Sequence, residues 1–505
     1  MSVAAPATLK LTHYINGQWT DSQASEWRDV VNPATGEVLA QVPLADAAEV
    51  NQAVDSAAAA FPEWRRTPPE DRIQPLFKLK MLLEDHIDDI ARIITQENGK
   101  TLTEAKAEMR RAIENVEVAC GIPLMMQGYN LEDVARGIDE MMIRQPLGVV
   151  AAITPFNFPG MIPFWFLPYA IATGNTFILK PSERVPLTIR YAYELLEKTG
   201  LPRGVVNLIN GGKTAVDALL DHPKIRAISF VGSTPVAKYV YSRAAATGKR
   251  AQCFGGAKNH AIVMPDADMD QTVDALIGAG YGSAGERCMA ISVAVPVGKT
   301  TADRLMEKLI PRVESLKIGT SIDPSADYGP LVTREALNRV RNYVEIGIKE
   351  GATLAVDGRG FKMQGYENGF YMGGCLFDNV TKDMRIYNEE IFGPVLSVVR
   401  AHDYKEALAL PSDHDYGNGV AIFTRDGDAA RDFAAKVNVG MVGINVPIPV
   451  PIAYYTFGGW KKSGFGDLNQ HGPDSIRFYT KTKTVTARWP SGVKEGAEFS
   501  IPTMN

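Results

Sequence analysis

The sequence predicts an α/β protein built on parallel, doubly wound sheets, and three observations support this fold class. Short β-rich runs alternate with helical runs along much of the chain, which is the order that a parallel sheet covered by helices requires. A second region of the same alternating kind spans residues 266–442. The 505 residues, 45% hydrophobic and 22% charged, are enough for two or three globular domains.

Strands are predicted where apolar, β-rich runs are short and continuous, as in sheets buried on both faces. Six such runs are Gly148–Ile153, Thr176–Leu179, Val205–Ile209, Ala227–Val231, Ala261–Met264 and Ile291–Val297. Helices are predicted between them, over Pro186–Thr199, Thr214–Asp221 and Pro235–Thr247.

Two further elements are predicted in the second half of the chain. The stretch Thr333–Gly351 is expected to be an amphipathic helix with four apolar residues on one face, namely Leu337, Val340, Val344 and Ile348. Residues Arg477–Trp489 alternate in polarity and are expected to end the fold as a strand arm.

Composition excludes several classes of function. A formal net charge of −5 provides no basic footprint, so we expect no nucleic-acid partner. The four cysteines lie far apart without a CxxC pair, and the seven histidines form neither an HExxH motif nor a close cluster. We therefore expect no metal site and no disulfide scaffold, and the cysteine pattern fits a reducing cytosol.

No export or membrane segment is predicted. Residues Met1–Lys10 lack the charged region and apolar run of a signal peptide. The most apolar stretch, Met161–Leu179, is interrupted by Pro163, Pro168 and Gly174. A buried helix that turns into a strand is therefore expected there, in place of a membrane helix. These features predict a cytoplasmic protein without a membrane partner.

Two glycine-rich segments match phosphate-binding patterns but lack the required context. Residues 210–214, NGGKT, open a helix after a strand, yet Asn207 stands where a P-loop needs its first glycine. Residues 280–285 match GxGxxG but follow the helical run Met269–Gly280, whereas the dinucleotide fingerprint follows a strand. We interpret the second segment as small residues that allow tight backbone approach just before Cys288.

Two other segments suit a dinucleotide better. Phe230–Pro235 ends a strand and begins a helix with hydroxyl residues and a proline. Such a helix start offers free N–H groups and a positive dipole end to a pyrophosphate. Leu179–Arg184 places Lys180 and Glu183 at another strand end, where they are able to bond ribose hydroxyls. Each segment alone is ordinary, and their combination favours a cofactor site.

Six motifs occur in the order TPFNFP, KPSE, FVGS, GAK, GxRC and EEIFGPV, and nearly the whole chain resembles the aldehyde dehydrogenase superfamily. The resemblance implies that Cys288 is the nucleophile, and that Asn157 and the backbone N–H of Cys288 stabilise the oxyanion. It implies NAD as the cofactor, because a carboxylate at Glu183 would repel the 2′-phosphate of NADP. The implied contacts are Lys180 and Glu183 at the adenine ribose, Gly232 and Ser233 at the pyrophosphate, Glu390 and Phe392 at the nicotinamide ribose, and Thr154, Phe156 and Arg184 along the groove.

The resemblance also implies the domain organisation. A Rossmann-like NAD-binding domain is expected over residues 1–128 and 148–258, with 458–478 added to it. An α/β catalytic domain is expected over residues 259–457. Residues 129–147 and 479–505 are expected to form a small β oligomerisation arm. The family's assembly implies a homotetramer built as a dimer of dimers.

Within the superfamily, four strings look like the CoA-acylating methylmalonate-semialdehyde dehydrogenases: KPSERVP, GAKNH, RCMA and INVPIPVP. Phe254, 34 positions before Cys288, stands where most aldehyde dehydrogenases carry the glutamate that activates the hydrolytic water. That branch often has asparagine at this position, and glutamine where this chain has Glu286. Since phenylalanine takes no proton, we expect coenzyme A to be the co-substrate that releases the acyl group.

A malonate-type semialdehyde carries a carboxylate one carbon from the aldehyde, so cations are expected beside Cys288. Arg287 is adjacent in sequence, and the family's other arginine aligns with Arg111 in the helical run Glu104–Cys120. Arginine suits bidentate carboxylate recognition, and a cation beside the thiol is expected to lower its pKa.

The expected reaction is therefore NAD-dependent oxidation of methylmalonate or malonate semialdehyde, with decarboxylation and transfer of the propionyl or acetyl group to CoA. One alternative is a hydrolytic semialdehyde dehydrogenase that uses another base. A second is a catalytically silent binding or structural protein on this fold, which the joint presence of Cys288, Asn157 and Lys180 disfavours.

Overall fold

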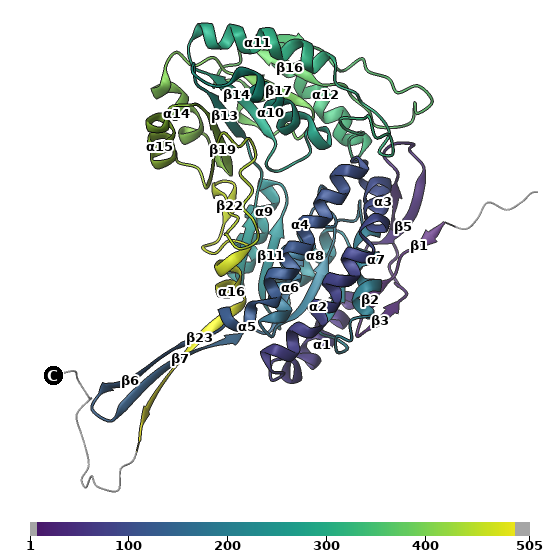
Figure 1. Ribbon diagram of the computed structural model, residues 1–505. Helices are drawn as coiled ribbons and strands as arrows, with labels where there is room; N and C mark the ends of the chain where they lie inside the picture. The colour runs from purple at the N-terminus through teal and green to yellow at the C-terminus, as the bar shows by residue number, and fades with distance from the viewer. Residues whose placement is uncertain (1–7, 490–505) are drawn as a thin grey trace, which may run out of the picture.

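The structure is a computed structural model that describes residues 8–489. Two large, mostly parallel sheets dominate it, each with helices packed against it, and a narrow antiparallel arm projects from the body (Figure 1). The eight-stranded sheet has the order β22-β12-β11-β8-β9-β10-β2-β3, and the seven-stranded sheet the order β15-β16-β17-β14-β13-β19-β20. The predicted α/β class is confirmed.

The eight-stranded sheet contains four of the predicted strands. Its parallel core consists of β8 (Val149–Ile153), β9 (Thr176–Lys180), β10 (Val206–Leu208), β11 (Ile225–Val231) and β12 (Arg250–Phe254). Antiparallel strands close its edges: β2 (His13–Ile15) and β3 (Gln18–Thr20) on one side, and β22 (Gly464–Phe465) on the other.

Both faces of this sheet are buried, which explains why its strands are continuously apolar. In β8, Val150 and Ala152 join one hydrophobic cluster, while Val149, Ala151 and Ile153 join another. On the first side pack α2 (Pro69–Asp85), α3 (Ile87–Asn98), α4 (Leu102–Cys120), α6 (Leu167–Ala172) and α7 (Leu187–Glu197). On the other pack α1 (Ala47–Trp64), α8 (Lys213–Asp221) and α9 (Thr234–Ala246).

The strand register gathers the motifs at one edge of this sheet. Ile153 pairs with Lys180 and with Phe230, and Val231 pairs with Phe254. Because these strands are parallel, their carboxyl ends and the segments that follow them meet at one edge. The loops carrying TPFNFP, KPSE and FVGS therefore lie together, as ligand sites in open α/β sheets do.

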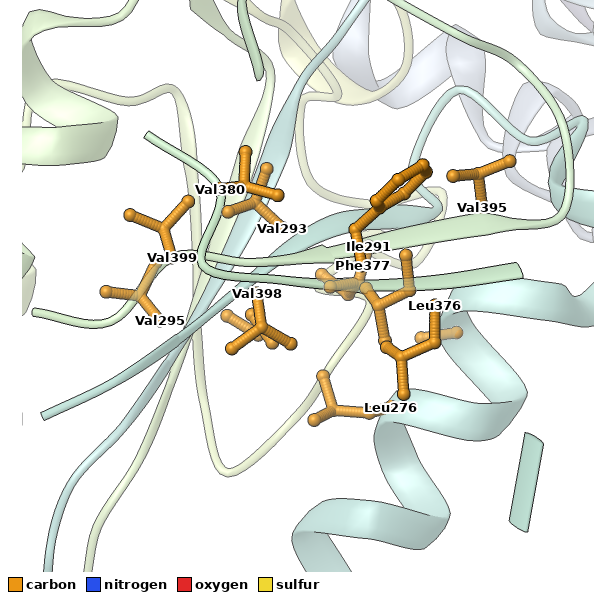
Figure 2. Packing of buried hydrophobic residues seen from close by; sticks show 14 of the residues in the cluster. Leu276, Ile291, Val293, Val295, Leu376, Phe377, Val380, Val395, Val398 and Val399 are labelled. Carbon is orange, nitrogen blue, oxygen red and sulfur yellow. The ribbon is translucent and has the colours of Figure 1, made fainter. Parts of the chain in front are cut away.

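The seven-stranded sheet comprises β13 (Asn259–Val263), β14 (Ile291–Pro296), β15 (Thr353–Val356), β16 (Cys375–Asp378), β17 (Val395–Val398), β19 (Gly419–Phe423) and β20 (Met441–Ile444). Its core packs valine, leucine and phenylalanine side chains against α10 (Met269–Tyr281) (Figure 2). Five further helices contribute residues to the same hydrophobic cluster: α11 (Lys299–Glu314), α12 (Arg334–Lys349), α13 (Arg385–Asn388), α14 (Tyr404–Asp413) and α15 (Gly427–Lys436).

The amphipathic prediction for α12 is correct at three of its four positions. Leu337, Val340 and Val344 are buried, whereas Ile348 is 41% exposed. Ile348 lies in the last turn of the helix, which extends past the sheet toward Gly351. The apolar spacing identified the face but not the point at which the helix leaves the core.

The projecting arm is a three-stranded antiparallel sheet of β6 (Tyr129–Ala135), β7 (Ile138–Pro146) and β23 (Thr480–Arg488) (Figure 1). The strand predicted over Arg477–Trp489 begins three residues later than expected. Helix α16 (Gly472–Tyr479) continues to Tyr479, because Ile476, Phe478 and Tyr479 pack into the core. Expectations for residues 490–505 lie outside the described residues, and the domain limits stay a prediction.

The remaining strands lie at the periphery. A three-stranded sheet joins β1 (Leu9–Lys10), β4 (Trp27–Val31) and β5 (Val38–Pro43), and β18 (Tyr416–Gly417) pairs with β21 (Trp460–Lys461). Short helix α5 (Ile122–Met125) precedes the arm.

The apolar stretch Met161–Leu179 folds as a short 3-10 turn, α6 and β9, as predicted. Within residues 8–489, no helix is long and apolar enough to cross a membrane.

Candidate active site

Cys288 lies in the loop between α10 and β14 and is half-buried. It borders three cavities. The first, of about 210 Å³, opens toward the eight-stranded sheet. The second, of about 230 Å³, lies against α4. The third, of about 10 Å³, lies beneath the loop at the start of β13 and β14. Residue Cys288 thus contributes to the walls of all three cavities.

The loop before Cys288 has an unusual backbone that a single carboxylate stabilises. Ser283, Ala284 and Gly285 have φ values of 49°, 52° and 72°, which non-glycine residues rarely adopt. Glu104 Oε1 accepts hydrogen bonds from the Ser283 N–H at 2.7 Å and from Arg287 Nη2 at 2.5 Å. Because Glu104 sits in the first turn of α4, the loop is tied to that helix.

The glycines of this loop support the interpretation of the GxGxxG match as close packing. A Cβ on Gly285 would lie 2.1 Å from the Gly393 carbonyl oxygen, and one on Gly282 would lie 2.6 Å from the Arg287 guanidinium. The segment follows helix α10, as predicted. A side chain at either glycine would therefore displace the loop that carries Cys288.

Two amides hold the peptide that follows the thiol. Asn259 Nδ2 donates to the Cys288 carbonyl at 3.0 Å, and Asn418 Nδ2 donates to the same oxygen at 3.1 Å. Asn259 Oδ1 also accepts from the Gly419 N–H at 2.9 Å. Asn259 at the start of β13 and Asn418 just before β19 therefore hold the Cys288 peptide, and the sequence predicted a role for neither asparagine.

The first cavity brings several predicted cofactor residues together with Cys288. Its lining includes Phe156, Asn157, Gly232, Ser233, Glu390 and Phe392. The rings of Phe156 and Phe392 meet edge to face with centroids 5.9 Å apart. Arg339, on α12, lines the same cavity and was not predicted; its only sequence signal was a cation within an amphipathic helix.

The start of α9 has the form expected of an anion site, with one correction. Ser233 is the N-cap, but its hydroxyl makes no capping hydrogen bond. The Thr234 hydroxyl instead donates to the Lys462 carbonyl and accepts from the Gly256 N–H. The first N–H groups of α9 consequently lack a side-chain cap, which leaves them able to bind an anionic group.

Four other predicted cofactor residues lie at or just after the ends of β8 and β9 and are not among the residues that line the first cavity. The Thr154 N–H donates to the Lys180 carbonyl at 3.1 Å, and Lys180 Nζ lies 3.2 Å from Glu183 Oε2. Burial opposes ionisation of Glu183, but the charges of Lys180 and Arg28 outweigh it and lower the pKa of this carboxyl. The Arg184 guanidinium lies 5.6 Å from the Phe156 ring centroid.

A buried ion pair sets the position of Asn157. Lys100 Nζ lies 2.5 Å from Glu108 Oε2, and both side chains are at most 1% exposed. The same ammonium donates to the Asn157 carbonyl at 2.7 Å, while Glu108 Oε1 accepts from the Gly160 and Met161 N–H groups. Removing one partner would leave a buried charge unpaired, so the pair fixes the loop that carries Asn157.

The second cavity brings both predicted arginines to Cys288. Arg111 and Arg287 line it together with Glu104 and Glu108. The rest of its wall is largely apolar, with Phe158, Met161, Trp165, Met289, Ile448, Val450 and Phe457. Arg111 Nη1 lies 2.8 Å from Glu114 Oε2, and its Nη2 donates to the Pro451 carbonyl at 2.6 Å. A small molecule in this cavity would meet two guanidinium groups and the thiol.

The adjacent cation lowers the pKa of the thiol as expected, but other influences outweigh it and the net shift is upward. Burial first, and then the negative charge of Glu390, raise the pKa of Cys288 to about 12. Arg287 acts in the opposite direction but is the weaker influence, because its guanidinium is already paired with Glu104. The thiol is therefore protonated at neutral pH unless another group takes the proton.

The two residues that depart from the family pattern are both buried. Phe254 ends β12 and packs in the hydrophobic cluster that Cys288 contacts. Burial raises the pKa of Glu286 to about 8. Glu286 Oε2 accepts from the Val332 N–H at 3.1 Å, and Oε1 is buried without a partner. Glu286 lines none of the three cavities.

Comparison with known proteins identifies the family to which this chain belongs. The profile described as Aldehyde dehydrogenase family matches residues 19–485, so the chain belongs to the aldehyde dehydrogenase family. Its fold agrees with that of solved members, which confirms the resemblance inferred from the six motifs. Among residues 8–489, no group of three or more His, Cys, Asp or Glu side chains is arranged to hold a metal.

Particular relatives are similar over almost their whole length. A malonate-semialdehyde dehydrogenase of Pseudomonas aeruginosa is 54% identical over 495 residues, 98% of this chain and 99% of the relative. The structure of a candidate methylmalonate-semialdehyde dehydrogenase of Sinorhizobium meliloti, complexed with NAD, is 59% identical with a TM-score of 0.96, covering 97% and 100% of the two chains. The methylmalonate-semialdehyde dehydrogenase of Oceanimonas doudoroffii is 53% identical with a TM-score of 0.95, covering 96% and 99%.

Proposed function

We propose that this protein oxidises malonate or methylmalonate semialdehyde with NAD and transfers the decarboxylated acyl group to coenzyme A. The observation that carries the proposal is the second cavity, where Arg111, Arg287 and the Cys288 thiol line one largely apolar space. A three-carbon semialdehyde has its carboxylate and aldehyde one carbon apart, so one small cavity has to present cation and nucleophile together. The names of the relatives point to the same substrate class.

The first cavity and the adjoining strand ends fit a dinucleotide. The uncapped start of α9, with Gly232 before it, suits a pyrophosphate. Glu390 and Phe392 would hold the nicotinamide ribose, and Lys180 with Glu183 the adenine ribose. NAD bound in the first cavity, which Cys288 also lines, would supply the hydride acceptor. The carboxylate of Glu183 would disfavour a 2′-phosphate.

Cys288 would attack the aldehyde carbon, forming a thiohemiacetal whose oxyanion meets the Asn157 amide and the Cys288 N–H. Lys100 Nζ donates to the Asn157 backbone carbonyl at 2.7 Å, so the backbone that carries the side-chain amide is already fixed. Loss of hydride leaves a thioester on Cys288. The carboxylate one carbon from the thioester carbonyl is set up to leave as carbon dioxide, since that carbonyl accepts the electrons of the broken C–C bond. The α-carbon of the resulting enolate then takes a proton from water to give the acetyl or propionyl thioester. Arg111 and Arg287 would orient the carboxylate until it leaves.

Release of the acyl group is proposed to need the CoA thiol because Phe254 offers no base. Its ring is 5% exposed and packs among apolar side chains, so it neither binds nor activates water. Glu286 is the nearest alternative base in sequence, but it borders none of the cavities around Cys288. The geometry therefore favours thiolysis over hydrolysis.

The deciding experiment is product analysis with malonate semialdehyde and NAD, with and without CoA. The proposal predicts acetyl-CoA and carbon dioxide when CoA is present. Without CoA it predicts about one equivalent of NADH per active site, followed by slow turnover. Equal turnover without CoA, with free acid as product, would instead establish the hydrolytic alternative.

We also propose that the arm pairs subunits into a homotetramer. Its strands expose Tyr129 at 70%, Leu131 at 63% and Ile143 at 36%, and Trp489 beyond β23 is 64% exposed. An exposed edge with apolar side chains is a template for strand pairing. Light scattering of the full chain, compared with a variant carrying Leu131→Lys and Ile143→Lys, tests this; a wild-type monomer would reject it.

A further inference from the structure

The first chemical step of the proposed function needs an acceptor for a proton. The thiol of Cys288 has to lose one before attack, and its pKa is raised to about 12 by burial and by Glu390. Phe254 is unable to take it. A base of near-neutral pKa within reach of the thiol, directly or through one water, would solve this problem.

The ionisable groups around the thiol are few. Of the described residues that line its three cavities, the arginines stay charged and accept no proton. Glu104 Oε1 is occupied by the Ser283 N–H and by Arg287. Glu108 is ion-paired with Lys100 and accepts two backbone N–H groups. Glu390 and Lys258 remain.

Lys258 and Glu390 share the third cavity with Cys288. The space of about 10 Å³ is about that of one water molecule, and its polar wall provides the partners that a buried water needs. Glu390 Oε1 accepts from the Ala257 N–H at 2.8 Å, and the proposed function assigns its carboxylate to the cofactor ribose. Lys258 Nζ donates to the Glu389 carbonyl at 2.8 Å, and the side chain is buried.

We propose that Lys258 is the proton acceptor for Cys288, acting through the water-sized third cavity; this rests on the proposed function, in which Cys288 is the nucleophile. As the S–H bond breaks, its proton passes to the water, which gives a proton to the neutral Lys258 amine. The sulfur's electron pair forms the bond to the aldehyde carbon. The resulting ammonium places a positive charge on the wall of the cavity that Cys288 also lines, just when the sulfur becomes anionic.

The electrostatics of Lys258 suit this role. Burial lowers the pKa of Lys258 to about 7, although Glu390 and Glu389 act against it. His260 and His414, the other titratable groups near it, are both buried with lowered pKa, so they stay neutral. Thiol and amine thus rest as a neutral pair, and the amine becomes available as pH rises through about 7.

The experiment is alkylation of Cys288 by iodoacetamide in the NAD-saturated enzyme, without substrate or CoA, followed by peptide mass from pH 5.5 to 10. The wild-type rate should rise through about pH 7 and level off. Lys258→Met should react roughly tenfold or more slowly at pH 7.5, with a rate that keeps climbing with pH. Lys461→Met is the matched control, since Lys461 also donates to backbone carbonyls but lines none of the three cavities; it should match the wild type.

Lys258→Arg provides a second test if the methionine variant does not fold. The arginine guanidinium keeps a charge and a donor for the Glu389 carbonyl but takes no proton. The rise of the alkylation rate through about pH 7 should therefore vanish in this variant. A wild-type profile in either variant would overturn the proposal. Because the assay contains neither semialdehyde nor CoA, its outcome is independent of whether the acyl group leaves by thiolysis or hydrolysis.

Discussion

Replacing Arg111 by methionine tests substrate recognition with the least disturbance to the nucleophile. Arg111 lines the second cavity from α4, and its exposed fraction is 29%. Two of its hydrogen bonds go to Glu114 and to the Pro451 carbonyl. Of the five N–H donors of a guanidinium, three are therefore left for a ligand. Arg287 is a poorer first choice because its guanidinium also ties the loop to Glu104.

The expected loss in kcat/KM follows from removing one charge-assisted pair, that between Arg111 and the substrate carboxylate. Such a pair contributes about 1.5–3 kcal/mol, which corresponds to a roughly 10- to 150-fold loss in kcat/KM. The loss should be confined to substrates with a carboxylate. Propionaldehyde, which has the same carbon skeleton as malonate semialdehyde without the charge, should be oxidised within about twofold of the wild-type rate.

The assay is NADH formation with malonate semialdehyde and with propionaldehyde in parallel. Arg110→Met is the matched control: Arg110 is the neighbouring residue on α4, pairs with Glu84 and does not line the cavity. It should leave both substrates unaffected. If Arg111→Met slows both aldehydes equally, Arg111 is structural and the recognition argument fails. An unchanged kcat/KM for the semialdehyde would refute it equally.

Three further predictions concern the nucleophile, the missing base and the buried acid. Cys288→Ala should abolish turnover while NAD affinity, measured by titration calorimetry, stays within a few-fold; an acyl adduct found on Cys253 would overturn the assignment. Phe254→Glu should partly restore hydrolysis without CoA, seen as a faster steady state after the NADH burst in stopped flow, although burying a charge limits the gain. For Glu286 the folded pKa of about 8 lies above the unfolded value, so stability should fall as pH rises from about 4.5 to 8. Glu286→Gln should remove this fall and stabilise the protein by about 1–3 kcal/mol at pH 8; equal melting shifts at pH 5 and pH 8 would contradict it.

The strands and the order of the motifs were predictable because both depend on local pattern. Continuous apolar runs such as Gly148–Ile153 produce buried strands wherever helices cover both faces, and β8 occupies nearly that range. Element ends were less predictable. Tyr479 stays in α16 because its side chain is buried in the core, a contact that the alternation of polar residues after it does not report.

The sequence by itself determined the nucleophile candidate, the family and the absence of a carboxylate at Phe254, since these depend on residue types and their spacing. Tertiary structure alone decided that Arg111 and Arg287 line one cavity with Cys288, although 176 positions separate the two arginines. It also decided that the pKa of the thiol rises overall although Arg287 lowers it. The desolvation and ion pairing of a group depend on which distant side chains pack around it. Here burial and Glu390 raise the pKa of Cys288 by more than the neighbouring Arg287, which is paired with Glu104, lowers it.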